Sequence, residues 1–510
     1  MTTNVFILYT GGTIGMGPRD PEDPISPLEP KSIGDLFRFL PDFRLYGEKK
    51  GIRTRNAGQK PKPDAFGAGG LPFLDLDNGN TIRFGSASFE KPVDSSDVGP
   101  ADWRRMAEMI ASVYDAYDGF VILHGTDTMA YTASALSFMF QNLGKPVVIT
   151  GSQLPVSGVR TDAVLNLMNA VFIAGYQASD LPLIPEVVIV FADRIVRGCR
   201  ASKVSTSDWA GIDSPNAPLL GTIGERIKIH DQEIRPVPLR PFAVNPRLDE
   251  NVFIIDLFPG FRSDRIEGLF RDPDIRGYIL RTYGTGNIPN DRALLGLIRN
   301  AVEAGKIVMN LSQCGTGTVE MGLYAASSAL IDIGMLSGLD MTREAAVTKM
   351  MWILGSGAAR PEQELQIDHR GEQSGSLYPI AFGGVPEEKA APACRRSRIP
   401  DIRLNRARIT GSSLRISDLG VKGAAVGERT ILHVYLNRPE ADHRTPPDDE
   451  KRIATLEFDW NGRPETRIKV VTRKTQAGIG DGEVSLTLAG GLPGHRFYFS
   501  GLHLEIVADA

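Results

Sequence analysis

Hydroxyl, carboxylate and amine side chains gather in four short clusters along the chain. In order they are Thr10-Gly11-Gly12-Thr13, "VDSSD" at 93–97, "HGTDTMAY" at 124–131 and "RASKVST" at 200–206. Three of the four follow apolar runs that are typical of buried strands. Ligands of open α/β sheets bind outside the carboxyl ends of the strands, so we expect several of these clusters to meet at one pocket.

A threonine in this set could act as a nucleophile. Its hydroxyl attacks poorly until a base removes the proton, so the site also needs a nearby proton acceptor. Lys203 could be that base if it is desolvated and held by the carboxylate of Asp127 through Thr126. Backbone N–H groups freed by the Gly11-Gly12 turn could form an oxyanion hole, because glycine permits close approach and unusual dihedral angles. These residue types predict acyl transfer through a threonine.

Further polar groups suit a substrate that is an amino acid. The carboxylates of Asp94 and Asp127 and the hydroxyl of Ser95 could pair with its ammonium and carboxylate groups. Taken alone, each cluster has a simpler interpretation, because Gly-Gly-Thr after a strand is usually a tight turn and a lysine such as Lys203 is usually solvated. His124 could be a base, but a single histidine at the end of a strand is more often structural. Catalysis is therefore predicted only from the clusters together.

The composition is that of an ordinary globular protein. The chain has 510 residues, 42% of them hydrophobic, enough for roughly three domains of ~150 residues. The formal charge is −4, from 57 basic and 61 acidic side chains, and there is no long basic run. This charge argues against nucleic acid and anionic membranes as partners. Neither a signal-peptide pattern nor a membrane-spanning apolar stretch is seen, which predicts a cytoplasmic protein with no membrane association.

The cysteines do not indicate a metal site or a disulfide framework. Cys199, Cys314 and Cys394 are odd in number and far apart, and they lack paired metal-ligand spacing. We expect all three to be free thiols.

Apolar strands alternate with amphipathic helices in the first part of the chain. The expected strands are at 5–10, 119–126, 145–152 and 186–193, and the expected helices are at 94–117, 129–143 and 160–175. This alternation predicts a parallel sheet covered on both faces, an open doubly wound α/β arrangement. Residues 19–92 are rich in Pro, Gly and charge, and we expect there a partly mobile insertion over the strand ends.

The whole chain is predicted to contain three domains. A second, smaller alternation of strands and helices follows a proline-rich connection, and the last part has short β runs between turn residues, which favours an all-β sandwich or barrel. The expected boundaries are an N-terminal α/β domain at 1–213, a connection at 214–248, a smaller α/β domain at 249–375, a linker at 376–395 and an all-β domain at 396–510.

Two long motifs connect the chain to a known family. "YTGGTIGM" and "DGFVILHGTDTMAYTASALSF", together with "DSSDVGPADW", "GKPVVITGSQLP" and the Lys203 segment, resemble the bacterial type I, cytoplasmic L-asparaginases. The resemblance continues through "ILRTYGTGN" and "NLSQCGTGTVEMG" and covers about residues 1 to 375. It implies a larger N-terminal and a smaller C-terminal α/β domain, a homodimer or homotetramer, and no cofactor. It also implies hydrolysis of L-asparagine to L-aspartate and ammonia.

The resemblance further implies roles for individual residues. Thr13 would be the nucleophile of acylation, and the second catalytic triad would be Thr126, Asp127 and Lys203. Asn287 would reach into a neighbouring subunit's site. The residues implied to contact the substrate are Gly12, Asp94, Ser95 and Asn287. No metal ligand is implied.

The chain departs from the family pattern in two places. The family has a tyrosine near the nucleophile on a mobile loop, whereas "GPRDPEDPISP" follows here and the next tyrosine is Tyr46. Common family members lack the β region beyond 396. Two other functions stay open: an asparaginase-like amino-acid sensor or scaffold with weak or no activity, and a glutamine amidohydrolase, for example the glutamine-hydrolysing subunit of a tRNA-dependent amidotransferase.

Overall fold

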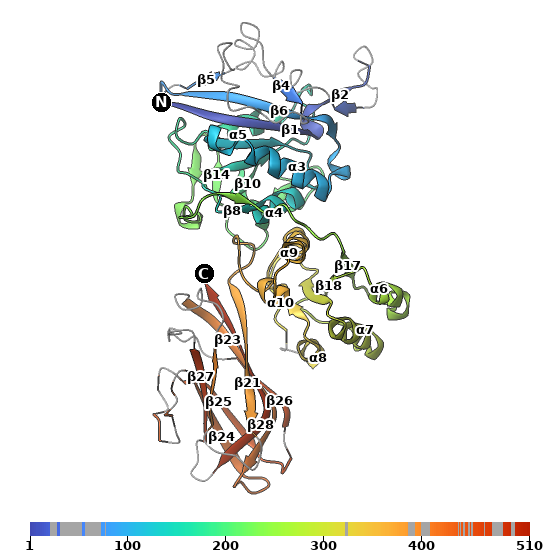
Figure 1. The fold of residues 1–510 in the computed structure, drawn as a ribbon, viewed down its shortest axis with the longest axis vertical. Helices are drawn as coiled ribbons and strands as arrows, with labels where there is room; N and C mark the ends of the chain where they lie inside the picture. Colours follow the sequence, from blue (N-terminus) through green and yellow to red (C-terminus); the bar gives the residue numbers. More distant parts are fainter. Residues whose placement is uncertain are drawn as a thin grey trace. The chain divides into compact units, whose positions relative to one another are not determined.

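The computed structural model describes most of the chain as two compact units (Figure 1). The first unit is Met1–Leu365 with His369–Glu372, and the second is Gln366–Asp368 with Gln373–Ala510. None of the described helices is long and apolar enough to cross a membrane. The described residues are 1–20, 28–30, 54–56, 73–76, 78–321, 325–385, 393–398 and 408–509, the last range with gaps at 437, 439, 442–443, 447–448, 450–451, 464, 472–482 and 491–494.

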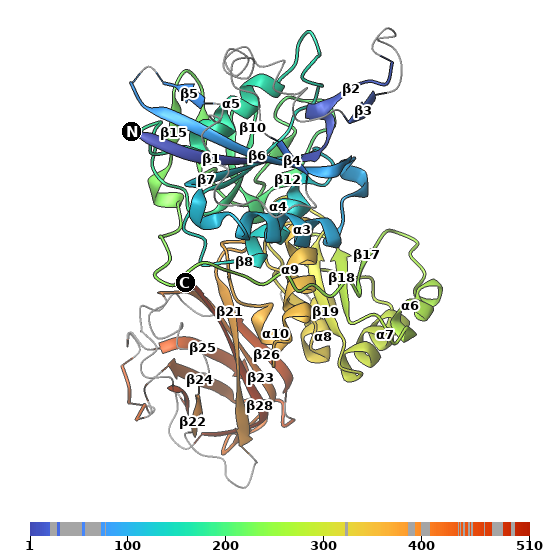
Figure 2. The ribbon, with the colours of Figure 1, turned by 45° about the horizontal axis from the view of Figure 1, so that its top comes forward.

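A large, mostly parallel sheet forms the centre of the first unit (Figure 2). The described strands run in the order β15-β14-β11-β10-β9-β7-β1-β6-β4, and β5 pairs with β6. The pairs from β10 through β9, β7, β1 and β6 to β4 are parallel, whereas β11, β14 and β15 add antiparallel strands at one side. The bounds are β1 Thr2–Gly11, β4 Thr54–Asn56, β5 Phe73–Asp75, β6 Thr81–Val93, β7 Gly119–Leu123, β9 Val147–Thr150, β10 Val187–Phe191, β11 Arg194–Arg197, β14 Gly221–Ile223 and β15 Ile227–Ile229.

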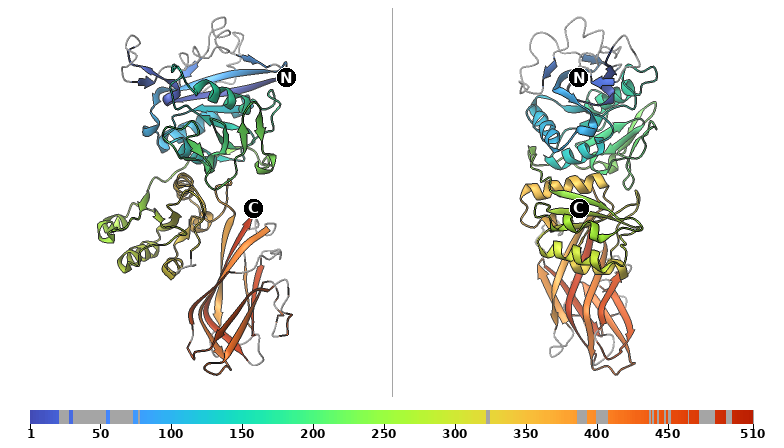
Figure 3. Two further views of the ribbon diagram at one scale, coloured as in Figure 1. Left: turned by 180° about the vertical axis from the view of Figure 1, so that it is seen from behind. Right: turned by 90° about the vertical axis from the view of Figure 1, so that its right-hand side faces the viewer.

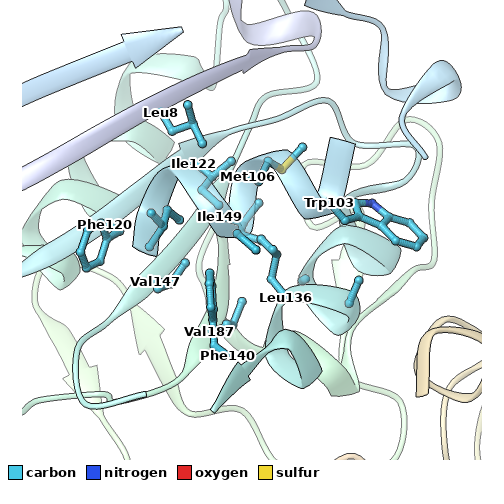
Figure 4. Packing of buried hydrophobic residues seen from close by; sticks show 14 of the residues in the cluster. Leu8, Trp103, Met106, Phe120, Ile122, Leu136, Phe140, Val147, Ile149 and Val187 are labelled. Carbon is cyan, nitrogen blue, oxygen red and sulfur yellow. The ribbon is translucent and has the colours of Figure 1, made fainter. Parts of the chain in front are cut away.

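Helices cover both faces of this sheet because its strands are apolar on both faces. In β1, Phe6 and Leu8 pack under α3 (Pro100–Ala111) and α4 (Met129–Met139), whereas Val5 and Ile7 pack under α5 (Ala163–Ala174). Figure 4 shows the first of these clusters, with Leu8 beside side chains of the neighbouring strands and of α3 and α4. This alternation confirms the predicted doubly wound α/β arrangement.

The strand β6 corrects one expectation. Residues 19–92 were expected to form an irregular insertion, but Thr81–Val93 is a long strand paired with β1. Its alternation of buried Ile82 and Phe84 is interrupted by small residues from Gly85 onward, so the apolar pattern is weak in the sequence although Thr81–Ser88 pair continuously with β1. Much of the rest of that range, 21–27, 31–53 and 57–72, lies outside the described residues.

A smaller parallel sheet completes the first unit. Its order is β17-β18-β19-β20, and α7 begins at the N-cap Asp291, whose carboxylate accepts hydrogen bonds from the backbone N–H groups of Ala293 and Leu294. The hairpin β14–β15 lies within 214–248, the range expected to be a connection, and extends the large sheet. The bounds are β17 Val252–Asp256, β18 Gly277–Thr282, β19 Ile307–Ser312, β20 Leu336–Ser337, α6 Glu267–Arg271, α7 Arg292–Glu303, α8 Ala325–Ile333, α9 Arg343–Ser356 and α10 Pro361–Glu364.

Three short antiparallel pairs join loops within the first unit. They are β2 Met16–Pro18 with β3 Leu28–Pro30, β8 Phe140–Gln141 with β16 Ala243–Val244, and β12 Ser202–Lys203 with β13 Ile212–Asp213.

The second unit is all β and consists of two antiparallel sheets (Figure 3). The orders are β21-β28-β23-β26 and β22-β27-β24-β25, and side chains from both sheets, such as Leu414 and Leu432, share one core. The range 376–395 was expected to be a linker, but it contains β21, which pairs with the distant strand β28. Pro and Gly interrupt the apolar pattern of this strand, so the sequence did not indicate it. The bounds are β21 Ser376–Val385, β22 Ala393–Arg398, β23 Arg408–Lys422, β24 Arg429–Leu436, β25 Arg452–Asp459, β26 Glu465–Val471, β27 Glu483–Gly490 and β28 Arg496–Asp509.

Candidate active site

Three strand ends meet at glycines that leave no room for a side chain. Gly12 has φ 84°, and a Cβ there would lie 2.2 Å from the backbone nitrogen of Gly125. Gly11 has φ 131°, and a Cβ there would lie 2.1 Å from the carbonyl oxygen of Val93. The Thr10 hydroxyl donates to the carbonyl of Leu123 at 2.9 Å. The carboxyl ends of β1, β6 and β7 are therefore in direct backbone contact.

Thr13 stands at this junction. It begins the short 3-10 helix Thr13–Gly15, directly after Gly12, and its side chain is half-buried. Because Gly12 touches Gly125, the residues that follow them, Thr13 and Thr126, start from neighbouring backbone positions. The double glycine is thus explained by close approach of two turns rather than by turn propensity alone.

Ser95 connects the cluster at 93–97 to the cluster at 124–131 by hydrogen bonds. Its hydroxyl accepts a hydrogen bond from the backbone N–H of Asp127 at 3.3 Å, and its carbonyl accepts one from the Thr128 hydroxyl at 2.6 Å. Asp94 caps the adjacent 3-10 helix Ser95–Asp97 by accepting from the backbone N–H of Ser96 at 2.9 Å. The Asp94 side chain is otherwise exposed.

Lys203 connects the cluster at 200–206 to the cluster at 124–131. Its ammonium donates to the Thr126 hydroxyl at 3.0 Å and to the Asp127 carboxylate at 2.6 Å. The lysine side chain is 19% exposed and the aspartate side chain 60% exposed. Such a solvated ion pair contributes at most about 1 kcal/mol to stability, so its geometry is more informative than its energy.

Asn287 is the one candidate that the described contacts do not bring to this junction. It follows the strand β18, and its backbone exchanges hydrogen bonds with Tyr283 in a tight loop. Gly286 has φ 109° and its carbonyl accepts from the Asn310 side chain, which anchors this loop to the small sheet. The Asn287 Oδ1 atom is buried and accepts no hydrogen bond from the described residues.

A buried ion pair next to Lys203 was not anticipated from the sequence. Arg200 lies 3.0 Å from the Asp340 carboxylate, with both side chains almost fully buried, and also donates to the carbonyl of Gly371. The Ser202 hydroxyl donates to Glu344 at 3.0 Å. These contacts bind the Lys203 segment to the small α/β domain. The only sequence signal was an arginine in a polar cluster, which is ordinarily solvated.

A cavity lies elsewhere in the first unit. It has a volume of about 700 Å³ and is lined by residues at the amino end of β10, such as Val187, and by Arg197 and Arg370. None of the candidate residues lines it, and the Arg197 guanidinium is already occupied by Glu186 at 2.6 Å. Among the described residues, no group of His, Cys, Asp or Glu is arranged to hold a metal ion.

Comparison with known proteins identifies the family. The model of the family described as "Asparaginase, N-terminal" matches residues 4–235, and that of "Glutaminase/Asparaginase C-terminal domain" matches residues 251–365. L-asparaginase 1 of Escherichia coli K12 is 43% identical over 354 residues, which is 69% of this chain and 91% of the relative.

Two solved structures show the same fold. L-asparaginase I from Vibrio cholerae matches with a TM-score of 0.58 and 36% identity, covering 73% of this chain and 99% of that chain. The thermostable L-asparaginase from Thermococcus kodakarensis matches with a TM-score of 0.59 and 28% identity, covering 73% of this chain and all of that one. By its motifs, its two α/β domains and these matches, the chain belongs to the asparaginase family.

Proposed function

We propose that this chain hydrolyses L-asparagine to L-aspartate and ammonia through an acyl-threonine intermediate. One observation supports this most directly: the Lys203 ammonium bridges the Thr126 hydroxyl and the Asp127 carboxylate on a turn that touches the glycine turn of Thr13. The proposed nucleophile and the proposed orienting carboxylate come from two touching turns, and the proposed proton acceptor Lys203 reaches them from a third segment.

Thr13 acts first in the proposed reaction. Its oxygen attacks the side-chain amide carbonyl of asparagine, and backbone N–H groups beside Thr13 stabilise the oxyanion, other than that of Gly12, which donates to the Val93 carbonyl at 3.2 Å. Lys203 takes part in this step as its neutral amine: the proton leaving Thr13 goes through Thr126 to the amine and then to the amide nitrogen, which departs as ammonia. Water then attacks the acyl-threonine, which releases aspartate and restores the hydroxyl.

Ser95, Asp94 and Asp127 are proposed to hold the amino-acid end of the substrate. The Ser95 oxygen accepts from the Asp127 backbone N–H, so its own hydroxyl hydrogen is available to donate to the substrate carboxylate. Asp94 and Asp127 keep exposed carboxylate oxygens that can accept from the substrate ammonium. This arrangement supports an α-amino acid rather than a simple amide.

The active protein is proposed to be a cytoplasmic homodimer or homotetramer. Asn287 does not contact the other candidate residues among the described contacts, and its buried Oδ1 lacks a partner there. Both facts fit a residue that completes its contacts with a neighbouring subunit. Light scattering across a concentration series tests the assembly, and a monomer with full activity would contradict it.

Ammonia release by the purified protein tests the proposed activity. We expect faster release from L-asparagine than from L-glutamine, and none from D-asparagine. The stretch after Thr13 has no tyrosine before Tyr46, an observation that favours the second candidate, a sensor that binds the amino acid without hydrolysing it. Calorimetric binding without ammonia release would support the sensor, and preferred release from glutamine would make the chain a glutaminase.

A further inference from the structure

His124 links the third cluster to two helices by a continuous chain of hydrogen bonds. Its Nδ1 lies 2.6 Å from the carbonyl oxygen of the next residue, Gly125, and its Nε2 lies 2.9 Å from the Thr132 hydroxyl on α4. The indole N–H of Trp103 on α3 donates to the same hydroxyl at 2.9 Å. Trp103 lies at one end of the core cluster in Figure 4, and all three side chains are buried.

The direction of every hydrogen bond in this chain follows from the groups present. The Gly125 carbonyl can only accept, so Nδ1 of His124 carries a hydrogen. Complete burial keeps His124 neutral, so its one hydrogen is on Nδ1 and its Nε2 is an acceptor. The Trp103 indole can only donate, so the Thr132 oxygen accepts there and gives its own hydrogen to Nε2. Complete burial lowers the pKa of His124 to about 4, against smaller opposing effects of the Gly125 carbonyl and Asp102.

The orientation of the Gly125 carbonyl determines the backbone position of Thr126. The peptide between these residues is planar, so the direction of the carbonyl sets the direction of the Thr126 N–H and the position of its Cα. Gly125 is also held from the other side, where Gly12 packs against its nitrogen. From this backbone position the Thr126 hydroxyl lies 3.0 Å from the Lys203 nitrogen.

We propose that His124 is a positioning residue, locked as its Nδ1–H tautomer by Thr132 and Trp103, that keeps Thr126 within reach of Lys203. The role rests on the proposed function of Lys203 and Thr126. It explains why α4, whose other interior positions are mostly Ala, Leu, Met and Phe, carries a fully buried threonine at this point.

Substitution of Thr132 separates positioning from packing. Thr132→Val keeps the shape but removes the hydroxyl, so Nε2 of His124 and the indole N–H of Trp103 lose this shared partner and the imidazole ring is no longer held against the Gly125 carbonyl. We expect kcat to fall about tenfold or more with KM changed by less than about threefold. Thr132→Ser, which restores a hydroxyl, should recover most of kcat. As a control, Ser137→Ala removes a buried hydroxyl of the same helix that bonds only to the Ala133 carbonyl, and kcat should not change.

Two outcomes of the kinetics overturn the proposal. One is a folded Thr132→Val variant with wild-type kcat. The other is a kcat of Thr132→Ser that is as low as that of Thr132→Val. Thermal unfolding of each variant establishes that it is folded at the assay temperature. Neutron diffraction from crystals of the unaltered protein provides a test that does not depend on any variant, because a deuteron on Nε2 rather than Nδ1 of His124 also overturns the proposal.

The crystal structure of Thr132→Val distinguishes failure of this inference from failure of the proposed function. We expect the Lys203–Thr126 hydrogen bond to be lengthened or lost in the variant, whatever substrate the protein acts on. An unchanged bond would overturn the positioning role even if asparagine is hydrolysed. If the Lys203–Thr126 hydrogen bond is lost in the variant and the unaltered protein hydrolyses no amide, the positioning role stands and the proposed function is refuted.

Discussion

The side chains of Lys203 and Thr126 are 77 positions apart in the chain, yet Nζ and Oγ1 lie 3.0 Å apart. The same ammonium contacts the carboxylate of Asp127, so one lysine holds two consecutive residues of the turn after β7. The two groups are thus within hydrogen-bonding distance before any substrate is present, as the proposed proton transfer to the neutral amine of Lys203 requires.

Removal of the nucleophile should abolish turnover without unfolding the protein. Thr13→Ala removes one half-buried hydroxyl, so the thermal unfolding midpoint should stay close to that of the wild type. Ammonia release should fall by about a thousandfold or more. Thr13→Ser should keep partial activity because a hydroxyl remains, and Thr222→Ala, at an exposed position of β14, is the matched control. A Thr13→Ala protein with more than about a tenth of the wild-type rate would refute the assignment.

Loss of the two charged partners should have different kinetic signatures. Lys203→Met removes the proton acceptor and should lower kcat, with little change in KM. Asp127→Ala also removes a proposed contact to the substrate ammonium, so KM should rise as kcat falls. Lys228→Met, at an exposed position of β15, controls for loss of a surface lysine. The proton-transfer role is contradicted by a normal kcat of Lys203→Met at every pH measured.

Alanine at Gly12 should be far more damaging than alanine at Gly79. Both glycines have positive φ, 84° and 80°, which L side chains rarely adopt, so both variants carry backbone strain of about 1 kcal/mol or more. At Gly79 the added methyl group meets open space, whereas at Gly12 it would lie 2.2 Å from the backbone of Gly125. We expect Gly79→Ala to keep normal activity and Gly12→Ala to lose nearly all of it. Equal effects in denaturant titrations and ammonia assays would mean that the two turns do not touch.

His124 should make the protein less stable as the solution becomes acidic. Its pKa is lowered from 6.5 to about 4 by burial, so the unfolded chain takes up a proton in this window that the folded chain does not. The contribution of neutral His124 to the free energy of unfolding is therefore complete above pH 6.5 and is lost as the pH falls toward 4. The free energy of unfolding should change by up to about 1.4 kcal/mol per pH unit from this group. Denaturant titrations should give a shallower slope for His124→Gln, and an identical slope would contradict the expectation.

The second unit should be dispensable for chemistry. All candidate catalytic residues lie in the first unit, and β21 belongs to the second because it pairs with β28. A chain ending at Glu372 should hydrolyse asparagine with kcat within about threefold of the full chain, a difference of ~0.7 kcal/mol. Residues 366–510 alone should show a β-type circular dichroism spectrum and no amidase activity. A folded but inactive truncated chain would show that the second unit contributes to the active site.

Local patterns were sufficient to predict the parallel strands β1, β7, β9 and β10 and the approach of two polar clusters at their ends. The strands ending at Thr10 and Leu123 are continuous apolar runs, and chemically distinctive residues follow each of them. Parallel strands bring their carboxyl ends to one edge, so the clusters of Thr13 and Thr126 could be expected to meet. The confirmed α/β fold depends on such short-range periodicity.

Only the tertiary structure determined the strands and hydrogen bonds whose partners lie far apart in the sequence. The strand β6 is recognisable by its pairing with β1, and β21 by its pairing with a strand more than a hundred residues later, because backbone pairing tolerates Gly, Ser and Pro that obscure an apolar pattern. The direction of the hydrogen bonds around His124 and the burial of Arg200 against Asp340 likewise required the fold. A polar residue type reports which bonds are chemically possible, whereas only packing determines which donor faces which acceptor.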